Sequence, residues 1–270
     1  MFRLKYAPHF GMFKHSAGDD PVDQLKFAAD EGFTAWEENG MKDYPVSEQE
    51  RISKAMTQLG MQMGVFVPCL DIAWVPSLVT GKPEWTDKFL GDLKASVEVA
   101  KRMNATWMTV VPGTIAYNMD MGYQTASVIG ALKQGCEILE PHGLVMVIEI
   151  LNFRDHPSLF LTTVNQAFQI SKAVGSPACK VLNDLYHAQI QEGNLIPNID
   201  AAWSEIGYFQ LGDNPGRNEP TSGEINYRNV FAHIHGKGFS GILGMEHGMS
   251  RPGKEGERRL IEAYRECDAF

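Results

Sequence analysis

The sequence predicts an α/β protein, a single-domain (β/α)8 barrel of the TIM type that spans residues 1–270. Short apolar runs alternate with longer helical patterns almost without interruption along the chain. Eight such strand–helix units in 270 residues match the size of this barrel. The runner-up is a doubly wound open sheet, which would be expected to carry a glycine-rich phosphate turn after an early strand. The sequence contains no such turn, so the barrel is favoured.

The expected strands are short, and the run VMVIEIL indicates that they are parallel. This run is apolar on both alternating faces except for its glutamate, which is typical of a parallel strand covered on both sides. Taken in order, the apolar runs predict strands at residues 4–10, 35–38, 62–67, 107–111, 145–151, 180–184, 207–211 and 241–246.

The stretches between these strands have helical periodicity and end at polar residues or glycines. Gly60, Gly143 and Gly175 each stand where a helix is expected to end, and glycine accepts the left-handed conformation that caps a helix. The pattern predicts helices at residues 21–31, 47–59, 87–103, 123–140, 161–174 and 227–237.

The overall charge narrows the class of partner. Lys and Arg total 24 against 33 for Asp and Glu, and this excess of negative charge opposes binding to a nucleic-acid backbone. It does not oppose a small anionic substrate, which one arginine can hold. The four cysteines lack CxxC or zinc-type spacing, so we expect buried, reduced thiols. With no signal peptide and no apolar run of roughly 20 residues, we expect no membrane partner and a cytoplasmic location.

Four polar residues stand at the carboxyl ends of expected strands. They are Glu149 in VIEILN, Asp184 in VLNDLYH, Gln210 in YFQLGD and Glu246 in LGMEHG. Catalytic groups of a barrel come from these ends, so the side chains should meet at one mouth. Three carboxylates would repel one another there unless a cation is bound. An all-oxygen ligand set suits Mg²⁺ or Mn²⁺ rather than zinc, so the sequence predicts one divalent metal ion. For each residue alone, the alternative is a helix cap or a salt bridge.

Two further residues near these strand ends are candidates for substrate binding. His187 follows Asp184 by three residues, so we expect it in the loop above the mouth, where it can donate a proton or a hydrogen bond to the substrate. Asp155 follows Glu149 by six residues, and it either orients the substrate or caps a helix that begins near Pro157. The roles of three other polar residues stay open: His9, Glu37 and Glu38.

The loop after the seventh expected strand is long and polar. Between residues 208 and 227, Arg217 is the only cation. A guanidinium can grip a carboxylate through two parallel hydrogen bonds, so we predict that Arg217 binds an acidic group of the substrate. The alternative is a salt bridge within the loop, to Asp213 or Glu219.

These motifs carry a resemblance to a known family. The stretch FQLGDNPGRNEPTSGEINY resembles the seventh-strand signature of hydroxypyruvate isomerases, in which an HxQ strand leads into a PGRxEPxxGEINY loop. IEILN, DLYHAQ and GMEHG fall in the family's order and spacing. The sequence is thus similar to the hydroxypyruvate isomerase branch of the xylose isomerase-like TIM barrel superfamily. It departs from the family pattern at Tyr208, where histidine is common, and in HGMSRPG after Glu246.

The resemblance implies a site and a reaction. It makes Glu149, Asp184, Gln210 and Glu246 the metal ligands, and it makes Glu149 and Glu246 the acid/base residues. The implied reaction isomerises a small hydroxy-carbonyl substrate through an enediolate, taking hydroxypyruvate to 2-hydroxy-3-oxopropanoate (tartronate semialdehyde). Ketose 3-epimerase relatives have histidine in place of Gln210, so the glutamine favours the isomerase.

Several alternatives to this reading stay open. One is a ketose 3-epimerase or a related sugar or sugar-acid isomerase on the same barrel. Another is a non-catalytic barrel that binds metal or sugar. A barrel-type DNA repair endonuclease would need several metal-binding histidines and a basic groove, which the sequence lacks. Enzymes of this type commonly pair, which leaves a homo-oligomer open.

Overall fold

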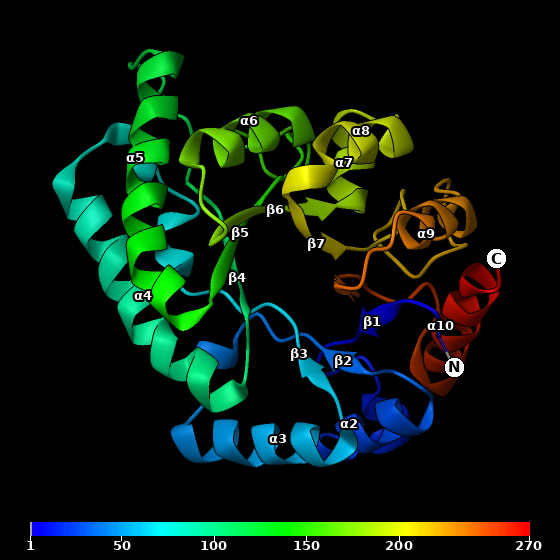
Figure 1. The fold of residues 1–270 in the computed structure, drawn as a ribbon. Helices are drawn as coiled ribbons and strands as arrows, with labels where there is room; N and C mark the ends of the chain where they lie inside the picture. Colours follow the sequence, from blue (N-terminus) through cyan, green and yellow to red (C-terminus); the bar gives the residue numbers. More distant parts are fainter. Residues whose placement is uncertain (1) are drawn as a thin grey trace.

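The computed structural model describes residues 2–270 as a ring of parallel strands enclosed by helices (Figure 1). Six strands form one sheet in the order β1-β8-β7-β6-β5-β4, and β2 pairs with β3. The bounds are β1 Lys5–Ala7, β2 Ala35–Trp36, β3 Gln62–Met63, β4 Trp107–Val110, β5 Val145–Glu149, β6 Cys179–Asp184, β7 Ile206–Gln210 and β8 Ile242–Gly244.

Isolated contacts close the two sheets into a barrel. On one side, parallel bridges join Met63 to Ala105 and Phe66 to Met108, which connects β3 to β4. On the other side, the Glu37 amide donates a hydrogen bond of 2.9 Å to the Pro8 carbonyl, just beyond the ends of β2 and β1. The predicted (β/α)8 fold class is therefore confirmed, and each expected strand overlaps an observed one.

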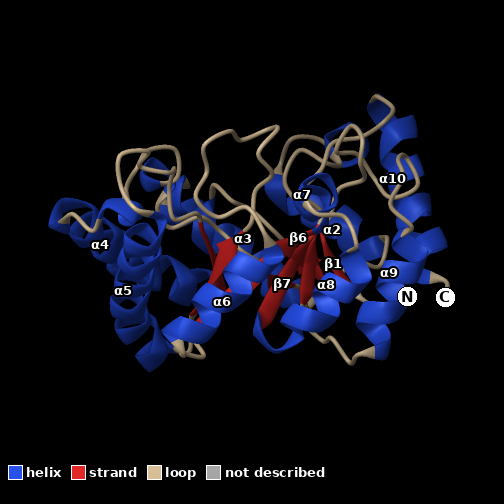
Figure 2. Cartoon of the chain, turned by 90° about the horizontal axis from the view of Figure 1, so that it is seen from above, coloured by secondary structure: helices blue, strands red, loops and turns tan. Residues whose placement is uncertain are grey.

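The strand register brings the carboxyl ends to one level. Asp184 at the end of β6 pairs with Gln210 at the end of β7, and Gln210 pairs with Gly244 at the end of β8. Glu149 at the end of β5 pairs with Leu182. The last residues of β5 to β8 therefore open on the same mouth. Figure 2 shows the longer loops gathered along one edge of the molecule.

The helices surround the ring and lie where the periodicity predicts them, with four additions. The sequence predicted no helix at Lys14–Ala17 (α1), Leu185–Gln191 (α7), Leu195–Ala202 (α8) or Gly253–Asp268 (α10). The bounds are α1 Lys14–Ala17, α2 Pro21–Asp30, α3 Val46–Leu59, α4 Pro83–Met103, α5 Met121–Leu139, α6 Val164–Val174, α7 Leu185–Gln191, α8 Leu195–Ala202, α9 Tyr227–Gly236 and α10 Gly253–Asp268.

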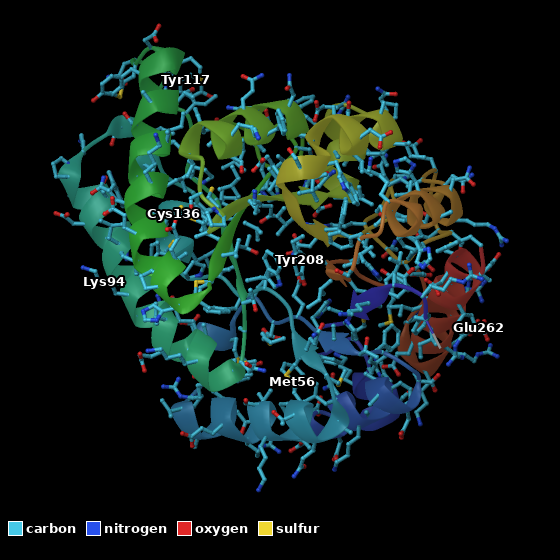
Figure 3. All side chains as sticks on the ribbon, viewed as in Figure 1. Met56, Lys94, Tyr117, Cys136, Tyr208 and Glu262 are labelled. Carbon is cyan, nitrogen blue, oxygen red and sulfur yellow. The ribbon has the colours of Figure 1, made fainter. Side chains whose placement is uncertain are left out.

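The interior of the barrel is filled mainly by short aliphatic side chains and one large aromatic residue. Tyr208 on β7 is fully buried there, and Figure 3 shows it inside the ring of strands. Its neighbours in this inner cluster are Ala7, Ala35, Val65, Val147, Leu182 and Ile242. The larger core lies outside the strands, under the helices. As predicted, the four cysteines are buried and free. None of the helices in residues 2–270 has the length and apolar composition needed to cross a membrane.

Candidate active site

The four polar residues predicted at strand ends lie together at the barrel mouth. Glu149, Asp184 and Gln210 are the last residues of β5, β6 and β7, and all three are buried. Glu246 lies two residues beyond β8, and 27% of its side chain is exposed. Ligand atoms of Glu149, Asp184 and His187 lie within 4.8 Å of one another. The convergence expected from the fold is therefore present.

Arg217 reaches into this mouth from the loop after β7. Its Nη2 atom donates to Asp184 Oδ2 at 3.0 Å and to Glu246 Oε2 at 2.7 Å. The guanidinium carbon lies 5.0 Å from the centre of the Tyr186 ring, which holds its plane over an aromatic face. Gly212 gives this side chain room, because a Cβ at that position would approach Arg217 Cγ to 3.1 Å.

The loop that carries Arg217 is tied down by its own carboxylates. Asp213 accepts hydrogen bonds from the backbone amides of Gly223 at 2.9 Å and Ile225 at 3.0 Å. Glu219 accepts from the Ser250 amide at 2.8 Å. Both carboxylates are thus occupied, and the alternative of an Arg217 salt bridge to Asp213 or Glu219 is wrong. The arginine faces the site because Asp213 binds its own loop and Glu219 binds the loop after β8.

Burial and mutual repulsion act most strongly on Glu149. Its pKa is raised well above the ordinary range, first by burial and then by the charges of Glu246 and Asp184. Burial also raises the pKa of Glu246, but Arg217 and a 2.9 Å hydrogen bond from Asn39 oppose that rise. The two glutamates therefore differ in character. Both line the cavity, but hydrogen bonds from Asn39 and Arg217 hold Glu246 in place, whereas Glu149 is the more easily protonated of the two.

His187 lies in the first turn of α7 rather than in a loop, because Asp184 caps that helix. Asp184 Oδ1 accepts from the amides of Tyr186 at 2.8 Å and His187 at 3.2 Å. The alternative of a helix cap is thus also true of Asp184, but only for one oxygen. Oδ2 remains directed at Arg217 and lies 3.6 Å from His187 Nε2.

Hydrogen bonds fix which nitrogen of His187 carries the proton. Asn152 Oδ1 accepts from the amides of Arg154 and Asp155, so its Nδ2 must be the atom 2.7 Å from His187 Nδ1. His187 Nδ1 is therefore an acceptor, and Nε2 bears the hydrogen. Burial lowers the pKa of His187 to about 4, so the ring is neutral at pH 7. His187 presents an N–H donor to the mouth, which suits a substrate oxygen better than a metal ion.

Asp155 does not cap a helix, because the next helix, α6, begins at Val164 and is capped by Thr163. The carboxylate accepts from Asn152 Nδ2 at 2.9 Å and from the Tyr186 hydroxyl at 2.8 Å. It is exposed and touches the residue that orients His187. Substrate binding by Asp155 stays a prediction.

The donor set at the mouth fits a divalent cation. Within residues 2–270, Gln210 Oε1 is buried and has no hydrogen-bond partner. Its Nε2 atom donates to Glu37 Oε1 at 2.8 Å, so the amide is oriented. A partnerless carbonyl oxygen beside three carboxylates is an all-oxygen site for a hard cation. His187 belongs to the same cluster, but its tautomer directs a proton rather than a lone pair into the mouth.

A cavity of about 620 Å³ opens from these residues. Glu149, Glu246 and Arg217 line it at the mouth of the barrel. Trp74 and His156 form part of its wall and stack at 5.2 Å between ring centres. The volume falls within the range of about 300–1,000 Å³ that is usual for small-molecule sites.

Sequence reasoning missed several residues that shape this site. Asn39 was not singled out, although it follows Glu37 and Glu38 at the end of an expected strand, and that position was a usable signal. Asn152 stands three residues after Glu149, in a stretch that departs from the family pattern, but the sequence assigned it no role, because that role depends on its contact with α7. His9 bonds to the carbonyls of Phe10 and His247.

Comparison with known proteins shows which families the chain resembles. Residues 25–267 match the family described as xylose isomerase-like TIM barrel. The chain is 28% identical over 227 residues to 2-oxo-tetronate isomerase of Pectobacterium atrosepticum, covering 84% of this chain and 86% of the relative. It is 27% identical over 183 residues to hydroxypyruvate isomerase of Escherichia coli, covering 68% and 70%. A crystal structure of an AP endonuclease of family 2 from Brucella melitensis matches with a TM-score of 0.81 at 23% identity, covering 94% of this chain and 96% of that chain, which shows the fold alone.

We expect the free energy of unfolding of the metal-free protein to fall as the pH rises between about 4.5 and about 8. Burial, followed by the charge of Glu246, raises the pKa of Glu37 from 4.5 to about 8. In this range the folded state keeps a proton that the unfolded chain has released. This contribution to stability is complete below the unfolded pKa and is lost as the pH rises through the folded pKa.

Glu37→Gln removes this titrating group, so its unfolding midpoint should depend less on pH than that of the wild type. Calorimetric Tm values in chelator, at steps between about pH 5 and about pH 8, measure both slopes. The exposed Glu84→Gln is the control and should keep the wild-type slope. An undiminished slope in Glu37→Gln would contradict the assignment.

Proposed function

The chain belongs to the xylose isomerase-like TIM barrel family and is an isomerase, and we propose that it interconverts the ketone and aldehyde forms of a small hydroxy acid with one divalent metal ion. The proposed reaction takes hydroxypyruvate to 2-hydroxy-3-oxopropanoate. One observation carries the proposal. Three carboxylates, a partnerless amide oxygen and an arginine meet at one mouth, beside a cavity that a small molecule can enter.

The proposed ligands are Glu149, Asp184, Gln210 and Glu246. A bound Mg²⁺ or Mn²⁺ would act as a Lewis acid, polarising the substrate carbonyl and stabilising the enediolate charge. All four proposed ligands offer oxygen atoms, and the pKa values of Glu149 and Glu246 are raised. Both features favour such a cation, because its charge offsets the repulsion among the buried acids.

Proton transfer requires a carboxylate beside the two reacting carbons. Glu149 is the group best suited to remove the proton from the hydroxyl-bearing carbon and to return it to the neighbouring carbon, since it lines the cavity and burial raises its pKa above the ordinary carboxyl range. Glu246 is the second acid/base candidate. The neutral His187 would donate its Nε2 hydrogen bond to the oxygen that gains negative charge.

Arg217 would bind the substrate carboxylate. It now contacts Asp184 and Glu246, which are two of the proposed metal ligands. When a metal ion offsets the charge of those acids, the guanidinium is free to pair with an anion in the cavity. The stacking on Tyr186 would keep its plane aligned for two parallel hydrogen bonds.

A second substrate is favoured by the size of the cavity. A volume of about 620 Å³ exceeds the need of a three-carbon acid. One of the relatives, matched over 86% of its own length, is a 2-oxo-tetronate isomerase. A four-carbon 2-oxo acid is therefore the second candidate, with the same residues in the same roles.

We predict that activity depends on a divalent metal ion. Protein stripped with a chelator should lose turnover of hydroxypyruvate and of 2-oxo-tetronate, and should recover it with Mg²⁺ or Mn²⁺, because the enediolate would otherwise lack its counter-charge. Product formation is followed by chromatography. A neutral ketose serves as the control substrate. Undiminished turnover by the chelated protein would overturn the metal-dependent mechanism.

We predict that Glu149→Gln and Glu246→Gln each lower kcat by about 10²–10⁴-fold, because a positioned acid/base group typically contributes that much. Both variants are assayed at saturating metal, and metal binding is checked separately by calorimetry. Glu84→Gln, on the surface of α4, should retain wild-type turnover. Near wild-type kcat in a metal-loaded Glu149 or Glu246 variant would remove that residue from proton transfer.

We predict that Arg217→Ala lowers kcat/KM for acidic substrates far more than for a neutral ketose. Loss of one charged hydrogen-bonding partner costs about 1.5–3 kcal/mol, or roughly ten- to a hundred-fold. Arg217→Lys should also be impaired, because lysine cannot form two parallel bonds. An equal loss on acidic and neutral substrates would argue against carboxylate binding and favour a ketose 3-epimerase.

A further inference from the structure

Glu37 is a buried carboxylate for which the proposed reaction has no use. It directly follows β2 and points into the barrel, where only 2% of the residue is exposed. Oε2 accepts from the Tyr208 hydroxyl at 2.7 Å, and Oε1 accepts from Gln210 Nε2 at 2.8 Å. No Lys, Arg or His within residues 2–270 forms a salt bridge with it. An unpaired buried acid is costly, so its two hydrogen bonds call for an explanation.

The second of these bonds determines which way the Gln210 amide faces. A glutamine side chain can turn over and exchange its oxygen and nitrogen with little change of shape. Glu37 Oε1 accepts the hydrogen bond here while Oε2 pairs with the Tyr208 hydroxyl, so the Gln210 nitrogen faces Glu37. The carbonyl oxygen is then left on the other side, buried and without a partner among the described residues. Gln210 itself stands at the end of β7, in register with Asp184 at the end of β6.

The barrel makes room for the Glu37 carboxylate and the Tyr208 hydroxyl at two glycines, one on β8 and one directly after β3. A Cβ at Gly244 on β8 would overlap the Glu37 carboxylate. A Cβ at Gly64, directly after β3, would overlap the Tyr208 hydroxyl and approach the backbone oxygen of Trp36 to 3.2 Å. Tyr208 is also the largest buried residue of the inner cluster, whose other buried members are aliphatic. The glycines on β8 and after β3 therefore leave space for the contact between Glu37, which follows β2, and Tyr208 on β7.

We propose that Glu37, held by Tyr208, is a positioning residue that orients Gln210 so that its carbonyl oxygen serves as a metal ligand. The inference rests on the proposed metal site. Removing a residue that hydrogen-bonds to a metal ligand, without itself touching the metal, typically weakens metal binding by about 10–100-fold. Glu37 acts through Gln210 and touches neither substrate nor metal.

Two other roles for Glu37 give different results. A carboxylate near the site could raise metal affinity by its charge alone, whatever the orientation of Gln210. It could instead only fill the barrel, in which case its loss would change stability and leave metal affinity alone. Glu37→Gln and Glu37→Leu separate these roles. The glutamine variant can carry no charge but can still accept from Gln210 and donate to Tyr208, whereas the leucine variant can do neither.

The experiment measures the Kd for Mn²⁺ by calorimetry on the full chain after chelator treatment. We expect Glu37→Leu to weaken Mn²⁺ binding about 10–100-fold and Glu37→Gln to stay within about threefold of the wild type. Equal weakening in both variants would assign the effect to charge and overturn the proposal. Unchanged affinity in Glu37→Leu would overturn it as well.

A double-mutant cycle tests whether Glu37 acts through Gln210. Gln210→Leu removes the proposed ligand, and adding Glu37→Leu to it should cause no further loss of Mn²⁺ affinity. A further loss of about tenfold in the double variant would show that Glu37 acts independently, against the proposal. Circular dichroism and Tm without metal confirm that each variant is folded.

Tyr208→Phe tests the same role without changing Glu37, in case Glu37→Leu does not fold. It removes one hydrogen bond from Glu37 and should weaken Mn²⁺ binding by about three- to tenfold in the wild-type background, but not in Gln210→Leu. A wild-type chain that binds no Mn²⁺ would refute the proposed metal site itself. Binding by the wild type with equal affinity in all Glu37 and Tyr208 variants would refute the positioning role alone.

Discussion

The repulsion among buried carboxylates is the constraint around which this barrel mouth is arranged. Glu149, Asp184, Glu246 and Glu37 are brought together by strand register, and burial raises the pKa of three of them. Arg217 supplies a single positive charge and contacts two of the four. A site with more acid than counter-charge is costly to fold and ready to accept a cation. The same imbalance that lowers stability would therefore provide the affinity that the proposed metal-assisted reaction needs.

The fold reduces this cost by giving individual oxygens separate tasks. Asp184 uses Oδ1 to cap α7 and keeps Oδ2 for the mouth. Glu246 receives Asn39 on one oxygen and Arg217 on the other. Within residues 2–270 the Glu149 side chain has no such hydrogen bond, which is consistent with its proposed role in proton transfer. Structural and chemical roles thus coexist because a carboxylate has two independent acceptor atoms.

Much of the fold and the outline of the site could be predicted from the sequence, because both follow from local patterns. Strand ends are marked by the change from apolar to polar residues, which located Glu149, Asp184, Gln210 and Glu246. In a parallel barrel that position alone predicts convergence. The helices that the sequence did not predict were overlooked for local reasons. α7 follows β6 without a turn, and α10 is rich in charged residues, with its buried side chains spaced between them.

The orientation of the polar groups could not be predicted, because it depends on contacts between residues far apart in the chain. Glu37 meets Gln210 across 173 residues, and Asn152 meets His187 across 35. The loop acids Asp213 and Glu219 looked like partners for Arg217, but each satisfies backbone amides instead. A sequence pattern shows which groups arrive at a mouth. Only the packing shows which atom of each group faces inward.

The neutral state of His187 connects these orientations to chemistry. A protonated imidazole would add a second cation beside Arg217 and would compete with a metal ion for the carboxylates. Burial instead lowers the pKa of the ring to about 4, and Asn152 directs its proton to Nε2. The mouth therefore offers a hydrogen-bond donor without adding charge. Such a donor stabilises an oxyanion and leaves the net negative charge of the site available to bind a cation. An imidazolium at this position would weaken that cation binding, so the low pKa of His187 is part of what makes the carboxylate cluster usable.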